Sequence, residues 1–157
     1  MTTVGTRRGE VEPIRWSRAG QEFRPLVLAE DSGGSFSLTE VTMPAGTGAG
    51  AHIHPRAEEC FYVVAGEYRF TIGDEQVLAS AGASVVVPRG TPHAFAVGDQ
   101  GGRHLTVFAP AGCERAFGEI GAAMDRGDTS PEFWAELGVK TATRFLAHNQ
   151  KEPPGTG

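Results

Sequence analysis

Two histidines separated by one residue, followed by a glutamate and flanked by glycines, restrict the fold of this chain more than any other feature. Residues 46–66 (GTGAGAHIHPRAEECFYVVAG) have the pattern G-x5-H-x-H-x4-E-x6-G, in which the polar positions are His52, His54 and Glu59. Successive side chains of an extended strand point to opposite faces, so the two histidines share a face. In the strand that follows, Glu59 rather than Glu58 stands at a position whose side chain points inward. The pattern therefore predicts two strands that direct two imidazoles and one carboxylate at the same point.

A second block supplies a third imidazole. Residues 82–93 (GASVVVPRGTPH) have the pattern G-x5-P-x-G-x2-H and end at His93. Pro88 and Gly90 predict a tight turn, which can aim the start of the next strand at a neighbouring strand. Three nitrogens and one carboxylate oxygen suit a divalent transition metal better than calcium or magnesium. We therefore expect one ion of Fe, Mn, Ni, Cu, Co or Zn, held by His52, His54, Glu59 and His93.

Short apolar stretches, bounded by glycine and proline, fill much of residues 21–110. They are rich in β-branched and aromatic residues, which favour strands. Many short strands at this spacing are typical of an all-β sandwich or barrel. The predicted strands are Leu26–Leu28, Phe36–Met43, Cys60–Ala65, Tyr68–Ile72, Gln76–Leu78, Ser84–Val87, His93–Val97 and His104–Phe108.

The pattern changes to that of helices after Pro110. Apolar residues recur at three- and four-residue intervals over residues 117–124, which indicates a first helix. A second helix is predicted to begin near Thr129 or Ser130, with a proline in its first turn. Gly138 is a point at which this helix could divide. The apolar residues of this helix are Phe133, Trp134, Leu137, Phe145 and Leu146. Of these, Phe133 and Trp134 with Leu137 are expected to dock the helix on the sheet, in preference to forming a lid over a ligand.

Length, composition and charge exclude several classes of protein. The chain has 39% hydrophobic and 21% charged residues, as soluble globular proteins do. Its formal net charge of -5 includes no basic run of the kind that binds nucleic acid. No apolar stretch approaches the ~20 residues that cross a bilayer, and no signal peptide is evident. We expect a cytoplasmic protein with neither nucleic acid nor membrane as partner, and one domain over residues 1–157: an N-terminal arm (1–20), a barrel (21–110) and a helical extension (111–150).

The two histidine blocks resemble the paired signature motifs of the cupin superfamily over about Gly46 to Val97. The resemblance implies a jelly-roll β-barrel of two antiparallel sheets, with a C-terminal helical extension in this chain, and a homodimer. One position departs from the family pattern, because the Asn often found four residues after the last histidine is Val97 here. The segment after the barrel, PAGCERAFGEIG followed by SPEFWAELG, is similar to the extension of quercetinase-like single-domain cupins from bacteria.

The resemblance implies an enzyme, specifically a metal-dependent dioxygenase that uses O2 on a flavonol-like or other enolisable aromatic substrate. Glu59 would then be both a metal ligand and the general base. By the same alternation, three apolar side chains point to the same face as the ligands: Phe61, Val63 and Phe95. We expect them in the barrel core and in the wall of a substrate pocket. The alternatives are a non-redox cyclase or isomerase of polyketide-like substrates, or a small-molecule-binding cupin, because fold and metal site alone do not fix the chemistry.

The remaining polar residues and the cysteines have simpler interpretations. His104 and His148 are expected to be hydrogen-bonded structural residues. Glu58 is expected to be a solvated or ion-paired surface carboxylate. Cys60 and Cys113 lie far apart in the sequence and are expected to be reduced thiols.

Overall fold

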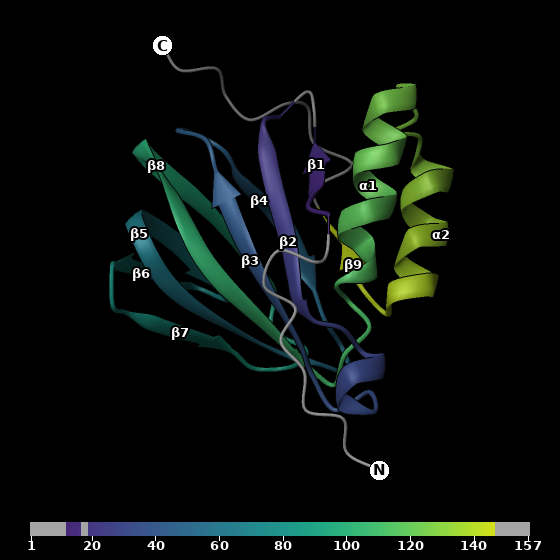
Figure 1. Cartoon of the computed structure of the whole chain (residues 1–157), viewed down its shortest axis with the longest axis horizontal. Helices are drawn as coiled ribbons and strands as arrows, with labels where there is room; N and C mark the ends of the chain where they lie inside the picture. The colour runs from purple at the N-terminus through teal and green to yellow at the C-terminus, as the bar shows by residue number, and fades with distance from the viewer. Residues whose placement is uncertain (1–11, 17–18, 147–157) are drawn as a thin grey trace.

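The computed structural model of the chain describes residues 12–16 and 19–146, which form a curled sheet of nine strands with two α-helices beside it (Figure 1). In chain order the elements are β1 (Ile14–Trp16), β2 (Gln21–Val27), a short 3-10 helix (Glu30–Ser32), β3 (Ser37–Met43), β4 (Gly48–Ile53), β5 (Glu58–Ile72), β6 (Glu75–Ser80), β7 (Ser84–Val87), β8 (His93–Ala109), α1 (Arg115–Arg126), α2 (Pro131–Thr141) and β9 (Arg144–Phe145).

The sheet has one continuous path and a branch. The path runs β1-β2-β3-β8-β4-β9, and β5 pairs with β6, β7 and β8. Every pairing is antiparallel. This architecture confirms the all-β jelly-roll class with C-terminal helices. The two predicted sheets are joined into one, because the long strands β5 and β8 pass through both halves.

A bend in β5 and β8 separates those two halves. Gly66 and Gly102 lie opposite each other at this bend, next to irregularities in the register. Gly66 has a φ of +89°, which favours glycine, and a Cβ at this position would collide with the carbonyl oxygen of Gly101. The bend explains why the sequence pattern divides each long strand. The predicted strands 60–65 and 68–72 are halves of β5, and 93–97 and 104–108 are halves of β8.

Three short strands were not among those predicted. β1 lies within the predicted N-terminal arm and pairs with β2. β4 is rich in glycine and alanine, so its composition carries little strand signal, although it pairs with β8. β9 contains Phe145, which was predicted to be helical. The second helix instead ends at Thr141, and Ala142 follows with a φ of 47°.

The start of α2 is as predicted. Ser130 is its N-cap, and the Ser130 hydroxyl accepts a hydrogen bond from the backbone N–H of Phe133 at 3.2 Å. Pro131 occupies the first turn, where its missing N–H costs no helical hydrogen bond. Neither α-helix in the described part of the chain is long and apolar enough to cross a membrane. His148, predicted as structural, lies outside the described residues.

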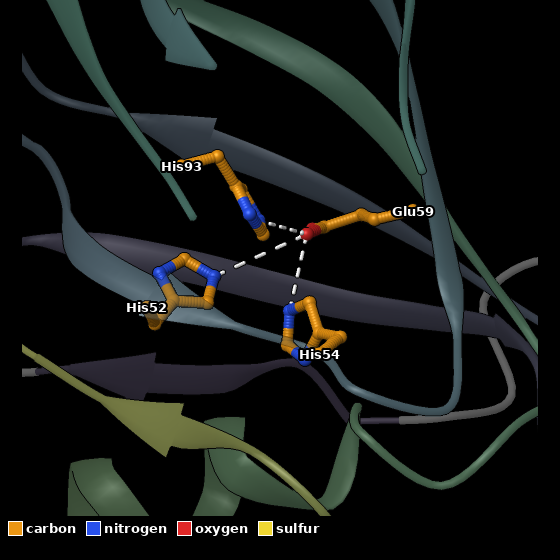
Figure 2. Close-up of side chains that lie close together, drawn as sticks. All are labelled: His52, His54, Glu59 and His93. Atoms are coloured by element: carbon orange, nitrogen blue, oxygen red, sulfur yellow. Dashed lines mark hydrogen bonds and ion pairs between the residues drawn. The ribbon is translucent and has the colours of Figure 1, made fainter. Parts of the chain in front are cut away.

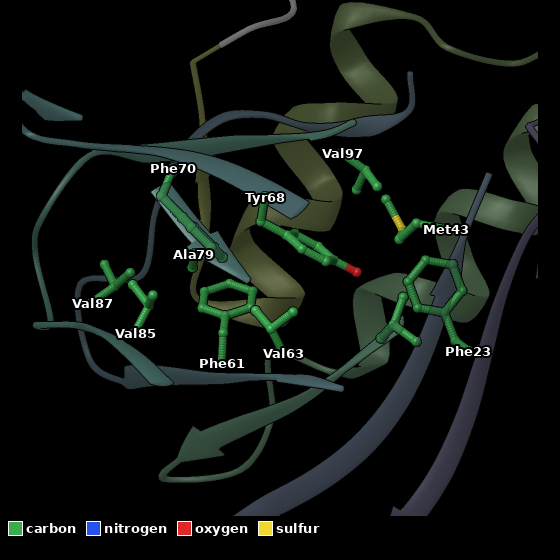
Figure 3. Close-up of a cluster of buried hydrophobic side chains, with 11 residues drawn as sticks. Phe23, Met43, Phe61, Val63, Tyr68, Phe70, Ala79, Val85, Val87 and Val97 are labelled. Atoms are coloured by element: carbon green, nitrogen blue, oxygen red, sulfur yellow. The ribbon is translucent and has the colours of Figure 1, made fainter. Parts of the chain in front are cut away.

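The main core fills the inside of the curled sheet (Figure 3). Its largest fully buried side chains include Tyr68, Phe61 and Phe70. The helices close one side of this core: the indole N–H of Trp16 donates a hydrogen bond to the carbonyl oxygen of Phe117 at 2.7 Å. This docking holds α1 against the sheet beside β1, where Figure 1 shows it.

Candidate metal centre

The four predicted ligands come together inside the curled sheet (Figure 2). His52 belongs to β4 and His54 follows that strand directly, while Glu59 lies in β5 and His93 opens β8. His52 and His93 are paired residues of β4 and β8, which places their rings on neighbouring strands. One ligand atom from each of the four residues can be chosen so that all lie within 4.8 Å of one another. The cluster can therefore hold a metal ion.

The imidazoles converge on one carboxylate oxygen. The Nε2 atoms of His93, His54 and His52 lie 2.9, 3.2 and 4.0 Å from Oε2 of Glu59. The side chains of His54, Glu59 and His93 are almost completely buried, and 13% of the His52 side chain is exposed. His52 is thus the most exposed of the four side chains.

The outer ring nitrogens fix the tautomer of each histidine. Nδ1 of His52 is 2.7 Å from the carbonyl oxygen of Gly50, and Nδ1 of His93 is 2.9 Å from that of Thr91. Carbonyl oxygens only accept hydrogen bonds, so both Nδ1 atoms carry the proton. The Nε2 lone pairs of His52 and His93 are consequently free to bind a cation.

Thr143 fixes the tautomer of the third histidine. Its hydroxyl lies 3.1 Å from Nδ1 of His54 and donates its own hydrogen to the carbonyl oxygen of Thr141 at 3.2 Å. The Thr143 oxygen must therefore accept the Nδ1–H of His54. The Nε2 atom of His54 is buried without a hydrogen-bond partner among the described residues.

This arrangement fits a divalent cation. With all three rings neutral, three nitrogen lone pairs face one carboxylate oxygen. Burial acts to lower the pKa of His93, but the contact with Glu59 outweighs it and raises that pKa, so the site favours a positive charge among these atoms. A cation among them satisfies all four at once. Imidazole nitrogens with one carboxylate are the donor set of first-row transition metals, as the sequence predicted, and the donor set does not identify one metal.

The charges within the cluster agree with this. Burial acts to raise the pKa of Glu59, but the neighbouring imidazoles of His54, His93 and His52 outweigh it and lower the pKa to about 2. Burial lowers the pKa of His52 to about 4. Near neutral pH, Glu59 is therefore an anion and His52 is neutral, as metal ligands must be. Burial in an apolar pocket would by itself raise the pKa of Glu59, and the imidazoles prevent this.

A cavity of about 220 Å³ opens beside the cluster. Of the predicted pocket residues, Phe61 and Phe95 line it, whereas Val63 is fully buried in the core and is not among the lining residues. The C-terminal extension supplies part of the cavity wall, through Trp134, Thr143 and Phe145. The side chains that sequence patterns did not single out as lining include Trp16, Gln21, Phe23, His104, Thr106, Cys113, Phe117 and Phe145.

Three simpler predictions are confirmed. Glu58 accepts two hydrogen bonds from Arg89, at 2.7 Å from Nε and 2.6 Å from Nη2, and its side chain faces solvent. Cys60 and Cys113 are both free thiols, and Cys113 is buried. His104 is hydrogen-bonded, as expected, with its Nδ1 at 2.8 Å from the hydroxyl of Tyr68.

Comparisons with known proteins agree with the fold and the cluster. Residues 39–108 match the family model described as Cupin domain. No curated protein matches the sequence significantly. Among solved structures, KdgF from Halomonas sp. is similar, with 18% identity and a TM-score of 0.61 over 70% of this chain and 96% of that chain. An RmlC-like cupin from Shewanella frigidimarina shares 23% identity, with a TM-score of 0.60 over 71% of this chain and 96% of that chain.

A third similar structure is the polyketide cyclase RemF from Streptomyces resistomycificus. It shares 25% identity, with a TM-score of 0.57 over 71% of this chain and 81% of that chain. The curled antiparallel sheet, the cluster of three histidines and one glutamate, and the match over residues 39–108 support the cupin superfamily as the family of this chain.

Proposed function

We propose that this chain is a metal-dependent enzyme that binds a small, mainly apolar substrate through an enolisable pair of oxygens. The observation that carries the proposal is the opening of the ligand cluster into a mostly apolar cavity of about 220 Å³. Pockets for drug-sized ligands are larger, roughly 300–1,000 Å³. An engineered cavity of ~150 Å³ accepts benzene, so a substrate with one or two rings suits this space better than a three-ring flavonol.

The residues of the site have separate roles in such a reaction. A divalent transition metal held by His52, His54, Glu59 and His93 would supply Lewis-acid chemistry to the substrate oxygens. Phe61 and Phe95 hold the apolar part of the substrate and exclude water. Glu59 accepts the proton of the substrate at its carboxylate oxygen. Because its contacts with the imidazoles lower its pKa, Glu59 becomes a stronger base when the substrate displaces it from them.

Non-redox cyclisation or isomerisation is the reaction class we favour. Its support is the similarity to a polyketide cyclase at 25% identity over 71% of this chain. Proton removal by Glu59 and polarisation of a β-dicarbonyl are sufficient for this chemistry, and no oxidant is required.

A dioxygenase is the second candidate, supported by the apolar lining of the cavity. O2 is a small apolar molecule, and a space lined by Phe61, Phe95 and Phe108 admits such molecules readily. The expected substrate is again an enolisable aromatic compound, and the difference is that O2 is consumed.

The experiment uses benzoylacetone, a one-ring β-dicarbonyl whose enol absorbs in the ultraviolet. Protein loaded with Zn2+, and separately with Fe2+, is titrated with benzoylacetone, and turnover is then followed with and without air. We expect metal-dependent binding, seen as a shift of the enol absorption. Metal-dependent acceleration of deuterium exchange at the carbon between the two carbonyls, in the absence of air, supports cyclase or isomerase chemistry, and consumption only with air, matched by O2 uptake, supports the dioxygenase. Binding that is equal with and without metal would contradict the proposed function.

A further inference from the structure

We infer that the end of the cavity remote from the ligand cluster is a second polar binding site, in which His104 and Gln21 hold a carbonyl oxygen at the far end of the substrate. The inference rests on the proposed function in that it concerns the same cavity and the same substrate. It assigns the substrate a second oxygen substituent, separated from the enolisable pair by an apolar skeleton.

The register of β5 and β8 sets the distance between the two ends. Glu59 lies opposite Phe108, and Val63 lies opposite His104. Along β5, the residue that pairs with His104 is therefore four positions from Glu59. At about 3.3 Å per residue, this is a backbone separation of about 13 Å. Glu59 and His104 both line the cavity. Phe61, which pairs with Thr106 between these two positions, also lines the cavity, and its ring is 5.5 Å from that of His104. A ligand that touches both Glu59 and His104 therefore passes an apolar stretch of the wall.

His104 offers a hydrogen-bond donor to this cavity. Only 1% of the residue is exposed, and the hydroxyl of Tyr68 lies 2.8 Å from its Nδ1. The Tyr68 hydroxyl makes no other hydrogen bond with the described residues, so its hydrogen goes to the Nδ1 lone pair. The proton of the His104 ring is then on Nε2. That Nε2–H has no protein acceptor among the described residues.

Packing fixes the position of the Tyr68 ring and therefore the direction of its hydroxyl group. The ring of Tyr68 lies over Gly102, where a Cβ would be 2.7 Å from the Tyr68 hydroxyl oxygen and from Cε2. Figure 3 shows the Tyr68 hydroxyl pointing away from Phe70 and toward the side of the core that holds Met43 and Phe23. A packing role for His104 accounts for its Nδ1 contact with Tyr68, but it leaves the Nε2–H without a partner in an apolar wall.

Gln21 supplies a second polar group at the same end. It is 6% exposed, lines the cavity, and its side-chain amide makes no hydrogen bond to any described residue. Phe23 in β2 pairs with Val41 in β3, and Val41 pairs with His104 in β8. Gln21 lies two residues before Phe23 and therefore shares its face of the sheet. Both polar groups line the cavity and lack a hydrogen-bond partner among the described residues, so a ligand in the cavity can satisfy both.

The charge state of His104 selects the class of oxygen. Burial lowers the pKa of His104 to about 4, more than the charge of Glu59 raises it. The imidazole is therefore neutral at neutral pH, and a neutral N–H donor suits a carbonyl oxygen better than a carboxylate. The Gln21 amide adds a second N–H donor to the same oxygen.

The test compares two probes in Zn2+-loaded protein: benzoylacetone, and its para-acetyl derivative, which adds one carbonyl at the far end of the ring. We expect the para-acetyl derivative to bind roughly threefold to tenfold more tightly, the size of one hydrogen bond. His104→Phe should remove this preference, whereas His104→Gln, which retains an N–H donor, should keep part of it. Phe95→Leu, a change in the apolar wall, should weaken both probes and leave the preference unchanged.

Each outcome bears on one proposal or both. Equal binding of the two probes, or a preference that survives His104→Phe, overturns the second site and leaves the metal-dependent function intact. A His104-dependent preference that is the same with and without Zn2+ supports the second site and contradicts the proposed function. If neither probe binds, both proposals fail. Zinc content and circular dichroism of each variant show whether it is folded and loaded, and His104→Gln provides the comparison if His104→Phe does not fold.

Discussion

The hydroxyl of Thr143 accepts the Nδ1–H of His54 at 3.1 Å, and this hydrogen bond joins the segment after α2 to the ligand cluster. Partners that orient a metal-binding histidine typically change metal affinity 10–100-fold when they are removed. We expect Thr143→Val, which keeps the shape and loses the acceptor, to weaken zinc binding by about that factor. Competition with a chelator measures it. Thr71→Val on an exposed strand position is the matched control, and an equal effect of both changes would show that His54 does not depend on Thr143.

Metal occupancy tests the ligand assignment directly. We expect about one transition metal ion per chain, and at least roughly tenfold lower occupancy when His52, His54 or His93 is replaced by alanine. Elemental analysis of the purified proteins gives the answer. His104→Ala is the control, because His104 lies outside the cluster. An empty site in His104→Ala together with a full one in His93→Ala would show the assignment to be wrong.

Glu59→Gln separates binding from proton transfer. The amide keeps the shape and a weak oxygen ligand but cannot act as a base. We expect metal to be retained in part, and turnover of a substrate to fall by ~10²–10⁴-fold. Steady-state kinetics of the metal-loaded variant measure this. Near wild-type turnover in a loaded Glu59→Gln protein would limit Glu59 to a structural role.

His104 makes stability depend on pH. The pKa of His104 is lowered from 6.5 to about 4 by burial, so between these values the unfolded chain binds the additional proton. Stability contributed by neutral His104 is therefore complete above pH 6.5 and is lost as the pH falls toward 4, by up to about 3 kcal/mol. Urea unfolding of metal-free protein at several pH values measures this. As the pH falls, the free energy of unfolding should decrease less steeply in His104→Gln than in the unmodified protein. The other groups of the cluster with shifted pKa values, Glu59, His52 and His93, are present in both proteins, so parallel curves would contradict the prediction.

Two glycines of α1 should respond in opposite directions to the same change. A Cβ on Gly121 would be 2.8 Å from Cδ1 of Trp16, whereas a Cβ on Gly118 would be 3.9 Å from Cδ1 of Ile14. Gly121→Ala should therefore destabilise the protein by about 1–3 kcal/mol through overpacking against a rigid indole. Gly118→Ala should stabilise it by up to about 1 kcal/mol through helix propensity. Thermal unfolding of the pair tests this, and destabilisation of equal size in both would locate the cause elsewhere.

The ligand cluster was predictable from sequence because its geometry is local. The parity of His52 and His54 and the position of Glu59 at the start of a strand depend only on alternation along the chain. The same alternation places Val63 in the core, as expected, but alternation alone does not show which inward side chains reach the cavity, and Val63 does not line it.

Other parts of the site depend on tertiary structure and left no local signal. β9 has only two residues, and it forms because β4 offers an unpaired edge. Phe145 was assigned to a helix because its spacing continued the apolar pattern of α2. His104 resembled any buried histidine in sequence, and only the cavity beside it separates a packing role from a binding role.

The pairing of β5 with β8 has a mechanical consequence for the whole sheet. Glu59 and His93 lie near opposite ends of this two-stranded ribbon. His93 pairs with Ile72, which is thirteen residues from Glu59 along β5. In a straight ribbon this separation would be about 43 Å. Their side chains are nevertheless 2.9 Å apart, because the ribbon bends at Gly66 and Gly102 and returns on itself. A cation bound by both residues acts as a cross-link between the ends of the ribbon, and it removes open, straightened conformations from the ensemble. Binding of a cation by the cluster and bending of the ribbon are thus coupled: each favours the other.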